Sequence, residues 1–471
     1  MSEGVRLVES GAAPTWGALL FGHRARTVWT ICAGVSIQAF GWFLVSTIMP
    51  SVVLELGSPA QLSWGTTAFL ALSIPGSAGA GYLKGRFGSR RLLVAASILV
   101  LASNLLGLAS PDMALFLVSR GLQGLGEGMV LALCYIMVGD SLSPREVTPT
   151  FGILAVVWAL ATLIGPSLAG LLTALVSWRF AFLPLLAIAA TFLWLVLTGP
   201  TTAKAEVTDN RPLPLGRLGL VAAAIVCISF AGTSRNILLA VPLVLLTLLL
   251  LGLAFRLDRL SPARLFPRRI LSFTEPSPLG VWILGLMFGS EAAAPLYMVY
   301  FVQIGHHTSV FFAGQFSAIV ALSWSVTALA VSRFDKRQCR PLMVLGPLSL
   351  TLGLAALMFW SSMSLWLSAM ALFLVGSGFG ISYSFFTEYA ISLAAEGERD
   401  VTAGAVPTLE NISAAIGAAL GGLLGNAAGF AGSGATDIPW SVPVVVYGAG
   451  TAVALIALGC AIRFHRLVRD V

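Results

Sequence analysis

The sequence predicts an all-α protein that crosses a membrane many times. Of its 471 residues, 57% are hydrophobic and only 10% are charged, whereas a soluble domain has about 25% charged residues. The hydrophobic residues form runs of about 20, the length at which an α-helix crosses a bilayer. If the runs cross in alternating directions, 24 of the 27 Lys and Arg residues fall on one side, two on the other, and Arg120 within a run. This sorting of charge is typical of a polytopic membrane protein.

Fourteen apolar runs are candidate spans. The weakest are the short run 217–234 and its neighbour 236–255, and without these two the count would be twelve with the same orientation elsewhere. No segment between the runs is long enough to fold as a separate domain. The fourteen runs cover residues 28–54, 62–83, 91–109, 113–139, 150–174, 179–198, 217–234, 236–255, 277–303, 309–332, 341–361, 364–389, 403–430 and 441–463.

The basic clusters set the orientation, because Lys and Arg accumulate in short cytoplasmic loops. Both termini are therefore expected in the cytoplasm, and the net charge of +7 reflects topology rather than affinity for nucleic acid. Residues 1–27 contain no separate apolar core of a signal peptide. The basic clusters are Arg24 and Arg26; Lys84, Arg86, Arg90 and Arg91; Arg145; Lys204, Arg211 and Arg217; Arg256, Arg259, Arg264, Arg268 and Arg269; Arg333, Lys336, Arg337 and Arg340; Arg399; and Arg463, Arg466 and Arg469.

Little in the sequence points to enzyme chemistry. His306-His307 has no nearby Cys or acid, so we interpret it as a solvated loop pair rather than a metal site. No nucleophile triad and no nucleotide-binding motif is visible. We expect no cofactor, no metal and no enzymatic activity. Five cysteines lack the spacing of a disulfide framework or a metal site: Cys32, Cys134, Cys227, Cys339 and Cys460.

A repeat divides the chain. The loop after the second span reads Gly81-Tyr-Leu-Lys-Gly-Arg-Phe-Gly-Ser-Arg-Arg91, and a weaker echo, Ser332-Arg-Phe-Asp-Lys-Arg337, follows the tenth. Each loop follows the second span of a set of six. The sequence therefore predicts an N-terminal six-helix bundle over 28–198, two inserted helices over 217–255, and a C-terminal six-helix bundle over 277–463. Repeats of this kind are common among secondary transporters.

Three motifs carry a resemblance to a known family. The first loop resembles the signature loop of the major facilitator superfamily, G-x-L-x-D-R-x-G-R-R. Span four contains Arg120-Gly-Leu-Gln-Gly-Leu-Gly126, which resembles the R-x-x-Q-G motif of that superfamily. Span five resembles the antiporter motif G-x8-G-x3-G-P-x2-G-G at these positions: Gly152, Ala161, Gly165, Pro166, Ala169 and Gly170.

The resemblance covers residues 28–463 and implies a major facilitator fold that exports rather than imports. Trp178-Arg-Phe180 and Arg264-Leu-Phe266 are similar to the fourteen-span drug:proton antiporter branch. Two features depart from the pattern. The acid of the signature loop is replaced by Gly85, and the acid usual in the first helix of that branch is missing from Gly41-Trp-Phe-Leu44. Proton coupling must therefore use other acids.

Ionisable residues inside spans are costly and mark functional sites. Glu127 lies seven residues after Arg120, on the same face of span four. The alternative for this pair is a structural ion pair. Glu291 is near the middle of span nine, where a helix–helix hydrogen bond is the alternative. Glu410 is near the start of span thirteen, where the helix dipole favours an acid. We interpret these four residues as candidates for proton coupling, and Glu388 as interfacial.

By the resemblance, spans one, four, nine and twelve line a central cavity. Aromatic and polar groups on them are candidate substrate contacts, because aromatic faces attract organic cations, although packing or interfacial roles are the alternative. These residues are Gln38, Trp42, Gln123, Tyr297, Tyr300, Gln303, Tyr383, Ser384 and Phe386. Gly165-Pro166 frees a backbone carbonyl and predicts a gating bend or a packing kink. The gating candidates are Gly81, Arg86, Gly88, Arg90, Arg91, Gly165 and Pro166.

Together these features predict a proton-coupled exporter of multiple drugs or of amphipathic compounds. It would work by alternating access in a bacterial cytoplasmic membrane. A dedicated exporter of one metabolite, such as a sugar or siderophore, is the main alternative, and a transport-dead sensor is a further one. The expected partners are a small organic substrate, protons and the lipid bilayer, with no nucleic acid. We expect a monomer.

Overall fold

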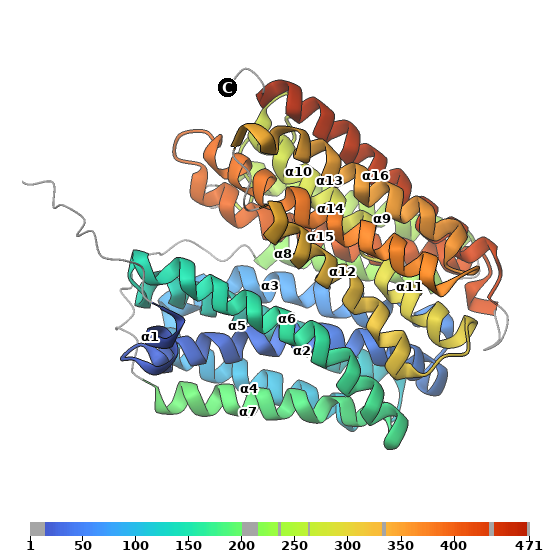
Figure 1. Ribbon diagram of the computed structural model, residues 1–471, viewed down its shortest axis with the longest axis horizontal. Helices are drawn as coiled ribbons and strands as arrows, with labels where there is room; N and C mark the ends of the chain where they lie inside the picture. Colours follow the sequence, from blue (N-terminus) through green and yellow to red (C-terminus); the bar gives the residue numbers. More distant parts are fainter. Residues whose placement is uncertain are drawn as a thin grey trace, which may run out of the picture.

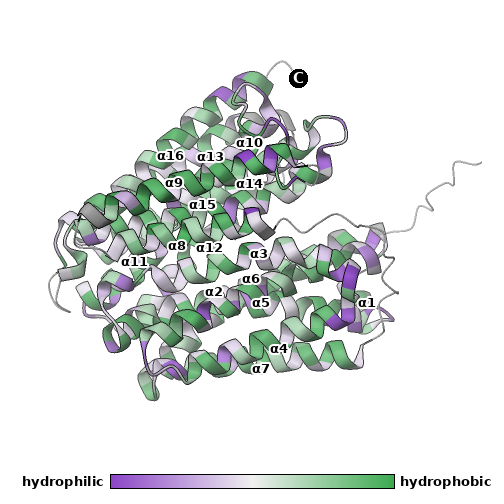
Figure 2. Ribbon diagram, turned by 180° about the vertical axis from the view of Figure 1, so that it is seen from behind, coloured by the Kyte–Doolittle hydropathy of each residue, from purple (hydrophilic) through white to green (hydrophobic). Residues whose placement is uncertain are grey.

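The computed structural model describes residues 15–199, 215–233, 237–261, 264–331, 336–432 and 438–468. Throughout these ranges the regular structure is helical. The described residues contain twelve candidate spans that are long and apolar enough to cross a membrane, and Gly216–Thr233 and Ala240–Leu260, in the two weakest runs of the sequence, are among them. The sequence echo at 332–335 lies outside the described residues. Figure 2 shows hydrophobic colours along the helices and hydrophilic colours gathered near their ends, most densely around α1.

The N-terminal bundle consists of six long helices, preceded by a short one, and Figure 1 shows them side by side. Thr15 caps the short helix, its hydroxyl accepting from the amide of Ala18 at 3.4 Å. Ser143 and Glu146 form a reciprocal capping box at the start of α6, which satisfies two amide groups of its first turn. The helices are α1 (Trp16–Phe21), α2 (Ala25–Leu56), α3 (Trp64–Phe87), α4 (Ser89–Leu108), α5 (Met113–Ser141), α6 (Pro144–Leu175) and α7 (Phe182–Thr198), with short 3-10 turns η1 (Pro59–Gln61) and η2 (Trp178–Ala181).

The C-terminal bundle repeats this plan, but its first span is broken. The run 277–303, expected as one continuous helix, is divided into α10 (Pro276–Glu291), α11 (Ala294–Tyr300) and a π-helical turn, η3 (Phe301–Gly305). Pro295 explains the break, because it has no N–H to donate to the carbonyl of Glu291 four residues earlier. The remaining elements are α12 (Val310–Val331), α13 (Lys336–Trp360), α14 (Leu365–Ser392), α15 (Arg399–Ala427), η4 (Phe430–Gly432) and α16 (Ser441–Val468).

The inserted helices α8 (Leu215–Thr233) and α9 (Ile237–Leu260) pack on each other, and α8 contacts both α3 and α15. Ser229 of α8 donates a hydrogen bond to Thr67 of α3 at 3.1 Å, within the buried interface. At its other end, Arg217 forms a buried ion pair with Asp258 of α9. The inserted pair therefore lies against both bundles rather than apart from them.

Two further long helices, α3 and α15, lie within the bundles but are less apolar than the twelve candidate spans. Both are rich in Gly, Ser and Thr, and the two pack against each other across the bundle boundary. Gly422 of α15 faces Ser63 at the start of α3, where an added Cβ would lie 2.3 Å from the Ser63 hydroxyl. Small residues allow this close approach of helices, and they lower the hydropathy at the same time.

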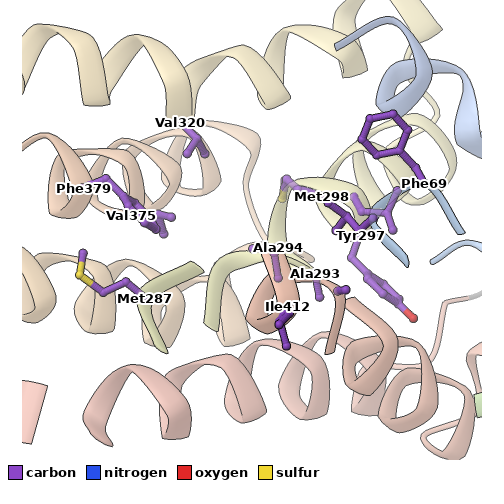
Figure 3. Packing of buried hydrophobic residues seen from close by; sticks show 14 of the residues in the cluster. Phe69, Met287, Ala293, Ala294, Tyr297, Met298, Val320, Val375, Phe379 and Ile412 are labelled. Atoms are coloured by element: carbon purple, nitrogen blue, oxygen red, sulfur yellow. The ribbon is translucent and has the colours of Figure 1, made fainter. Parts of the chain in front are cut away.

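The two bundles meet at one end of the molecule. We call it the 57–63 end, after the loop there, and the opposite end the 84–91 end, after the turn between α3 and α4. Figure 1 shows the bundles diverging toward the 84–91 end, where α1 lies. At the 57–63 end Gly170 of α6 packs on the backbone of Phe311 of α12, to which an added Cβ would approach within 2.3 Å. One hydrophobic cluster contains residues of both bundles, and Figure 3 shows Phe69 of α3 on the same side of it as Tyr297 and Met298.

Candidate functional site

Arg120, Gln123 and Glu127 form a continuous hydrogen-bonded relay along one face of α5. The guanidinium group of Arg120 donates to the side-chain carbonyl of Gln123, and the Gln123 amide donates to Glu127 Oε1 at 2.8 Å. All three side chains are buried. Gln123 therefore bridges the cation and the acid, which are not in direct ion-pair contact in the described structure.

Neighbouring helices hold both ends of the relay. Arg120 Nε donates to the carbonyl of Gly65 in α3 at 3.3 Å, and its guanidinium carbon lies 4.7 Å from the ring centroid of Phe69. At the other end, Gly41 of α2 faces Glu127 with no side chain between them. Glu127 Oε2 is buried without a hydrogen-bond partner among the described residues. This oxygen is free to carry a proton.

Glu291 ends α10 at the break in span nine. Its side chain is half-buried, and no hydrogen bond or ion pair joins it to the described part of the chain. The backbone beside it is tightly enclosed, because a Cβ added at Gly450 of α16 would lie 2.5 Å from the carbonyl oxygen of Ser290. The two residues that follow Glu291, Ala292 and Ala293, keep helical dihedral angles, so the span is interrupted in its hydrogen bonds rather than unwound.

Glu410 lies deeper in its helix than the sequence suggested. Helix α15 starts at Arg399, so Glu410 is about three turns inside it, beyond the first turn in which the helix dipole acts. Its side chain is 8% exposed, and Oε1 has no hydrogen-bond partner among residues with described side chains. The hydroxyl of Tyr383 in α14 interacts with this carboxyl group and lies near Tyr135 of α5 in the opposite bundle.

The expected substrate contacts fall into two groups. Trp42 is half-buried beside Phe69, with ring centroids 6.5 Å apart. Gln38 is half-buried and its Oε1 lacks a described partner. Gln303 donates to Ser51 of the other bundle at 3.3 Å. Gln303 thus lies at the boundary between the bundles, whereas Gln123 is buried within the N-terminal bundle.

Three other expected contacts are fully buried in helix packing. The Tyr297 hydroxyl donates to the Gly421 carbonyl at 3.2 Å, and both Tyr297 and Tyr300 pack on Phe430, with centroids 5.0 and 4.9 Å away. Phe386 packs on Phe464 of α16 at 5.4 Å. Ser384 is exposed. Residue type alone does not tell which face of a helix packs on its neighbours, so the sequence did not distinguish these buried rings from cavity-lining ones.

The gating candidates occupy two places. At the 84–91 end, Gly88 has φ +85°, a conformation that favours glycine, and Arg90 donates to the carbonyl of Leu197 at the end of α7. Arg86 lies 5.6 Å from the Phe87 ring centroid, while Gly81 and Arg91 are exposed. Gly85 stands where the signature loop of the family has an acid. The neighbouring Lys84 nevertheless forms an ion pair with Asp140 of α5.

Gly165 and Pro166 lie where α6 meets α2 and α12. A Cβ at Gly165 would lie 2.9 Å from Phe43 Cβ, and one at Gly314 of α12 would lie 3.0 Å from Pro166 Cβ. Helix α6 is continuous through these residues. On the same side, His306 Nε2 lies 2.9 Å from the carbonyl of Ser361, so this histidine is tied to the end of α13 rather than free in solvent.

Sequence reasoning missed an aromatic cluster near Glu410. Phe288, Trp324 and Phe379 join Tyr383 there. Phe288 lies three residues before Glu291 on an expected lining helix, which was a usable signal. Trp324 belongs to span ten, which the family resemblance did not place at the cavity. In the described ranges, no group of three or more His, Cys, Asp or Glu is positioned to hold a metal ion.

Two helical bundles with ionisable groups buried between their ends define a polytopic membrane transporter rather than an enzyme. The family model of the Major Facilitator Superfamily matches residues 31–418, and the chain belongs to this family. A "probable multidrug-efflux transporter" of Mycobacterium tuberculosis strain H37Rv is 28% identical over 423 residues, covering 86% of this chain and 88% of its own. The multidrug transporter MdtP of Bacillus subtilis is 27% identical over 265 residues, covering 54% of this chain and 48% of its own.

Solved structures agree on the fold. A crystal structure of a peptide transporter of the POT family with alafosfalin superposes with a TM-score of 0.71 at 16% identity, covering 95% of this chain and 96% of that chain. The nucleoside transporter NupG superposes with a TM-score of 0.66 at 10% identity, covering 92% of this chain and 99% of that one. At these identities the likeness concerns the fold alone.

Proposed function

We propose that the protein exports amphipathic organic compounds in exchange for protons, by alternating access across a bacterial cytoplasmic membrane. The observation that carries this proposal is the relay in α5, where Glu127 keeps one buried oxygen free beside a buried arginine. Support for export of several compounds comes from the relatives in Mycobacterium and Bacillus that are named multidrug transporters. No chemical step is required of the protein, because transport needs only binding and a change of access.

The relay suggests how protons and substrate compete. With Glu127 ionised, its negative charge offsets Arg120 through Gln123. A proton on Oε2 removes that charge without displacing Gln123, which is bonded to Oε1. A cationic substrate near the ionised acid also offsets the charge, so each ligand disfavours the other. Glu291 and Glu410 are the further proton carriers in this proposal.

We propose that α2–α7 and α10–α16 move as two bodies. They are held at the 57–63 end by neutral hydrogen bonds: Asn426 donates to the carbonyls of Ala60 and Gly232 at 2.9 and 2.8 Å, and Gln315 donates to Ser167 at 3.1 Å. These bonds cost little to exchange for water. A substrate would enter from the 84–91 end and leave after the 57–63 end has parted.

The proposed topology has fourteen spans, with α3 and α15 crossing as well. Both termini and the 84–91 end lie in the cytoplasm, and the transport unit is a monomer.

Cysteine labelling in a cysteine-free background tests the orientation. Arg86, at the 84–91 end, and His307, at the opposite end, are both exposed and therefore suitable sites for labelling. Arg86→Cys should react only from the cytoplasm and His307→Cys only from outside. The reverse pattern would invert the topology.

Proton flux in proteoliposomes tests the function. A pH gradient should drive uptake of ethidium into inside-out vesicles, and ethidium should release protons from vesicles without a gradient. Glu291→Gln should abolish the gradient-driven component while the variant reaches the wild-type membrane level. Wild-type transport by Glu291→Gln would remove Glu291 from the coupling site. Transport of one sugar or siderophore alone, across a broad panel of compounds, would contradict the multidrug proposal.

A further inference from the structure

Four aromatic side chains of the C-terminal bundle form one contiguous cluster. Phe288 of α10 lies 5.0 Å from Phe379 and 6.2 Å from Tyr383 of α14, measured between ring centroids. Trp324 of α12 completes the group, stacked on Phe379 at 5.0 Å with an interplanar angle of 21°. Its ring also lies 5.3 Å from Tyr383 and 6.1 Å from Phe288. Three helices thus contribute to one aromatic surface.

This cluster is only partly covered by the protein. Phe379 is 1% exposed and forms its base, while Phe288, Trp324 and Tyr383 are half-buried. Close helix packing fixes the rings, because Gly380 of α14 meets the backbone of Trp324, where an added Cβ would lie 2.3 Å from its carbonyl oxygen. The rings therefore present a preformed surface, which lowers the entropy cost of binding a flat partner.

Further aromatic groups lie on the N-terminal bundle. Tyr135 of α5 has a weak electrostatic influence on Tyr383. Tyr135 in turn pairs with Phe151 of α6, with ring centroids 6.0 Å apart. Tyr135 is 43% exposed and Phe151 is 46% exposed. Aromatic groups of both bundles are thus placed on the two sides of the same region.

A carboxyl group without a full set of partners adjoins the aromatic surface. Glu410 is 8% exposed, its Oε1 has no partner among the described side chains, and the hydroxyl of Tyr383 interacts with the group. Glu291 lies one helical turn beyond Phe288 on α10. An acid next to aromatic faces attracts a flat cation through charge, cation–π contact and apolar contact together. A neutral sugar could use only the apolar contact.

We infer that Phe288, Trp324, Tyr383 and Glu410 form a subsite of the C-terminal bundle that selects planar aromatic cations, with Tyr135 and Phe151 closing over the bound ring. This inference rests on the proposed function for its transport consequence but not for binding. The subsite gives the C-terminal bundle the task of recognising the substrate ring, beside the acids Glu291 and Glu410 that the proposed function places there.

Binding to the purified, full-length protein tests the subsite without transport. The probes are ethidium, a planar aromatic cation; phenanthridine, an uncharged planar ring system; and tetrapropylammonium, a cation with no ring. Trp324→Leu and Tyr383→Leu should each weaken ethidium binding about tenfold, because the planar ring loses a stacking partner in addition to a cation–π contact. Tetrapropylammonium makes a cation–π contact but cannot stack, so its binding should change less than about threefold. Glu410→Gln should weaken both cations and leave phenanthridine unchanged.

Matched controls separate recognition from folding. Phe373→Leu removes an exposed ring elsewhere on α14 and should leave ethidium binding unchanged. Trp324→Phe and Tyr383→Phe keep a ring and should restore most of the affinity lost in the leucine variants. If the leucine variants unfold, these phenylalanine variants decide the question alone, through a smaller loss specific to ethidium. Equal loss of all three probes, or wild-type ethidium affinity in Trp324→Leu, would overturn the subsite.

The outcome is distinct from that of the proposed function. Ring-dependent ethidium binding without proton-driven transport would leave the subsite standing and remove the antiport proposal. Proton-driven ethidium transport that is unaffected by Trp324→Leu and Tyr383→Leu would remove the subsite and leave the antiport proposal standing.

Discussion

Gly41 of α2 lies directly against the carboxylate of Glu127 in α5. A Cβ added at Gly41 would lie 3.0 Å from Oε1 and 3.2 Å from Oε2, and 3.4 Å from the Gln123 amide nitrogen. These separations are tighter than ordinary van der Waals contact, so any side chain at this position must push the carboxylate aside. The first helix contributes no acid of its own here, but it shapes the surroundings of the acid on the fourth.

This contact predicts the effect of Gly41→Ala. Alanine favours the helix by about 0.5–1 kcal/mol relative to glycine, so expression and thermal stability should not fall. The displaced carboxylate should lose its alignment with Gln123, and proton-driven export should fall about tenfold, equivalent to about 1.4 kcal/mol. Gly139→Ala, on α5 but with no atom near the added Cβ, should export normally. Normal export by both variants would show that Glu127 is not the coupling acid.

The relay itself predicts the behaviour of its charge variants. Glu127→Gln keeps an oxygen to accept from Gln123, so it should express normally and lose proton-driven export. Breaking a buried ion pair costs about 3–5 kcal/mol, and replacing both partners is often neutral. If the relay were purely structural, Glu127→Gln would lower the yield and Arg120→Leu with Glu127→Leu would restore both yield and export. We expect the double variant to be stable and inactive, measured by yield, thermal unfolding and vesicle transport.

Much of this arrangement could be predicted from the sequence. Seven-residue spacing placed Arg120 and Glu127 on one face of span four, and the bridging position of Gln123 follows from the same helical period. The break after Glu291 was missed because the apolar run continues through Pro295, and hydropathy does not record a lost N–H. Tyr297 and Tyr300 were expected at the cavity, but which face of a helix meets neighbouring helices depends on tertiary packing, which a single sequence does not contain.

The closed 57–63 end should open when its neutral bonds are removed. Asn426→Leu removes one hydrogen bond across the bundle boundary, to Ala60, and a second to Gly232 of the inserted helix α8. The bond to Ala60 is worth about 0.5–1.5 kcal/mol, so the ratio of closed to open molecules should fall about 2- to 12-fold. Distances between spin labels on α6 and α12 at this end should lengthen. Ser325→Ala removes only an exposed hydroxyl bonded within its own helix and should leave the distances unchanged. Unchanged distances in Asn426→Leu would show that these bonds do not hold the end closed.

The break in span nine predicts a separation of stability from transport. Pro295→Ala restores an N–H that can donate to the Glu291 carbonyl, so α10 and α11 should join into one helix and the thermal unfolding temperature should stay equal or rise. The added hydrogen bond should stiffen the backbone at Glu291 and reduce proton-driven export, because the acid no longer lies at a helix end. Pro347→Ala provides the control, since α13 continues through Pro347 without a break. Export at the wild-type rate by Pro295→Ala, in a variant whose amide exchange at residues 291–295 shows new protection, would establish that transport does not require the discontinuity.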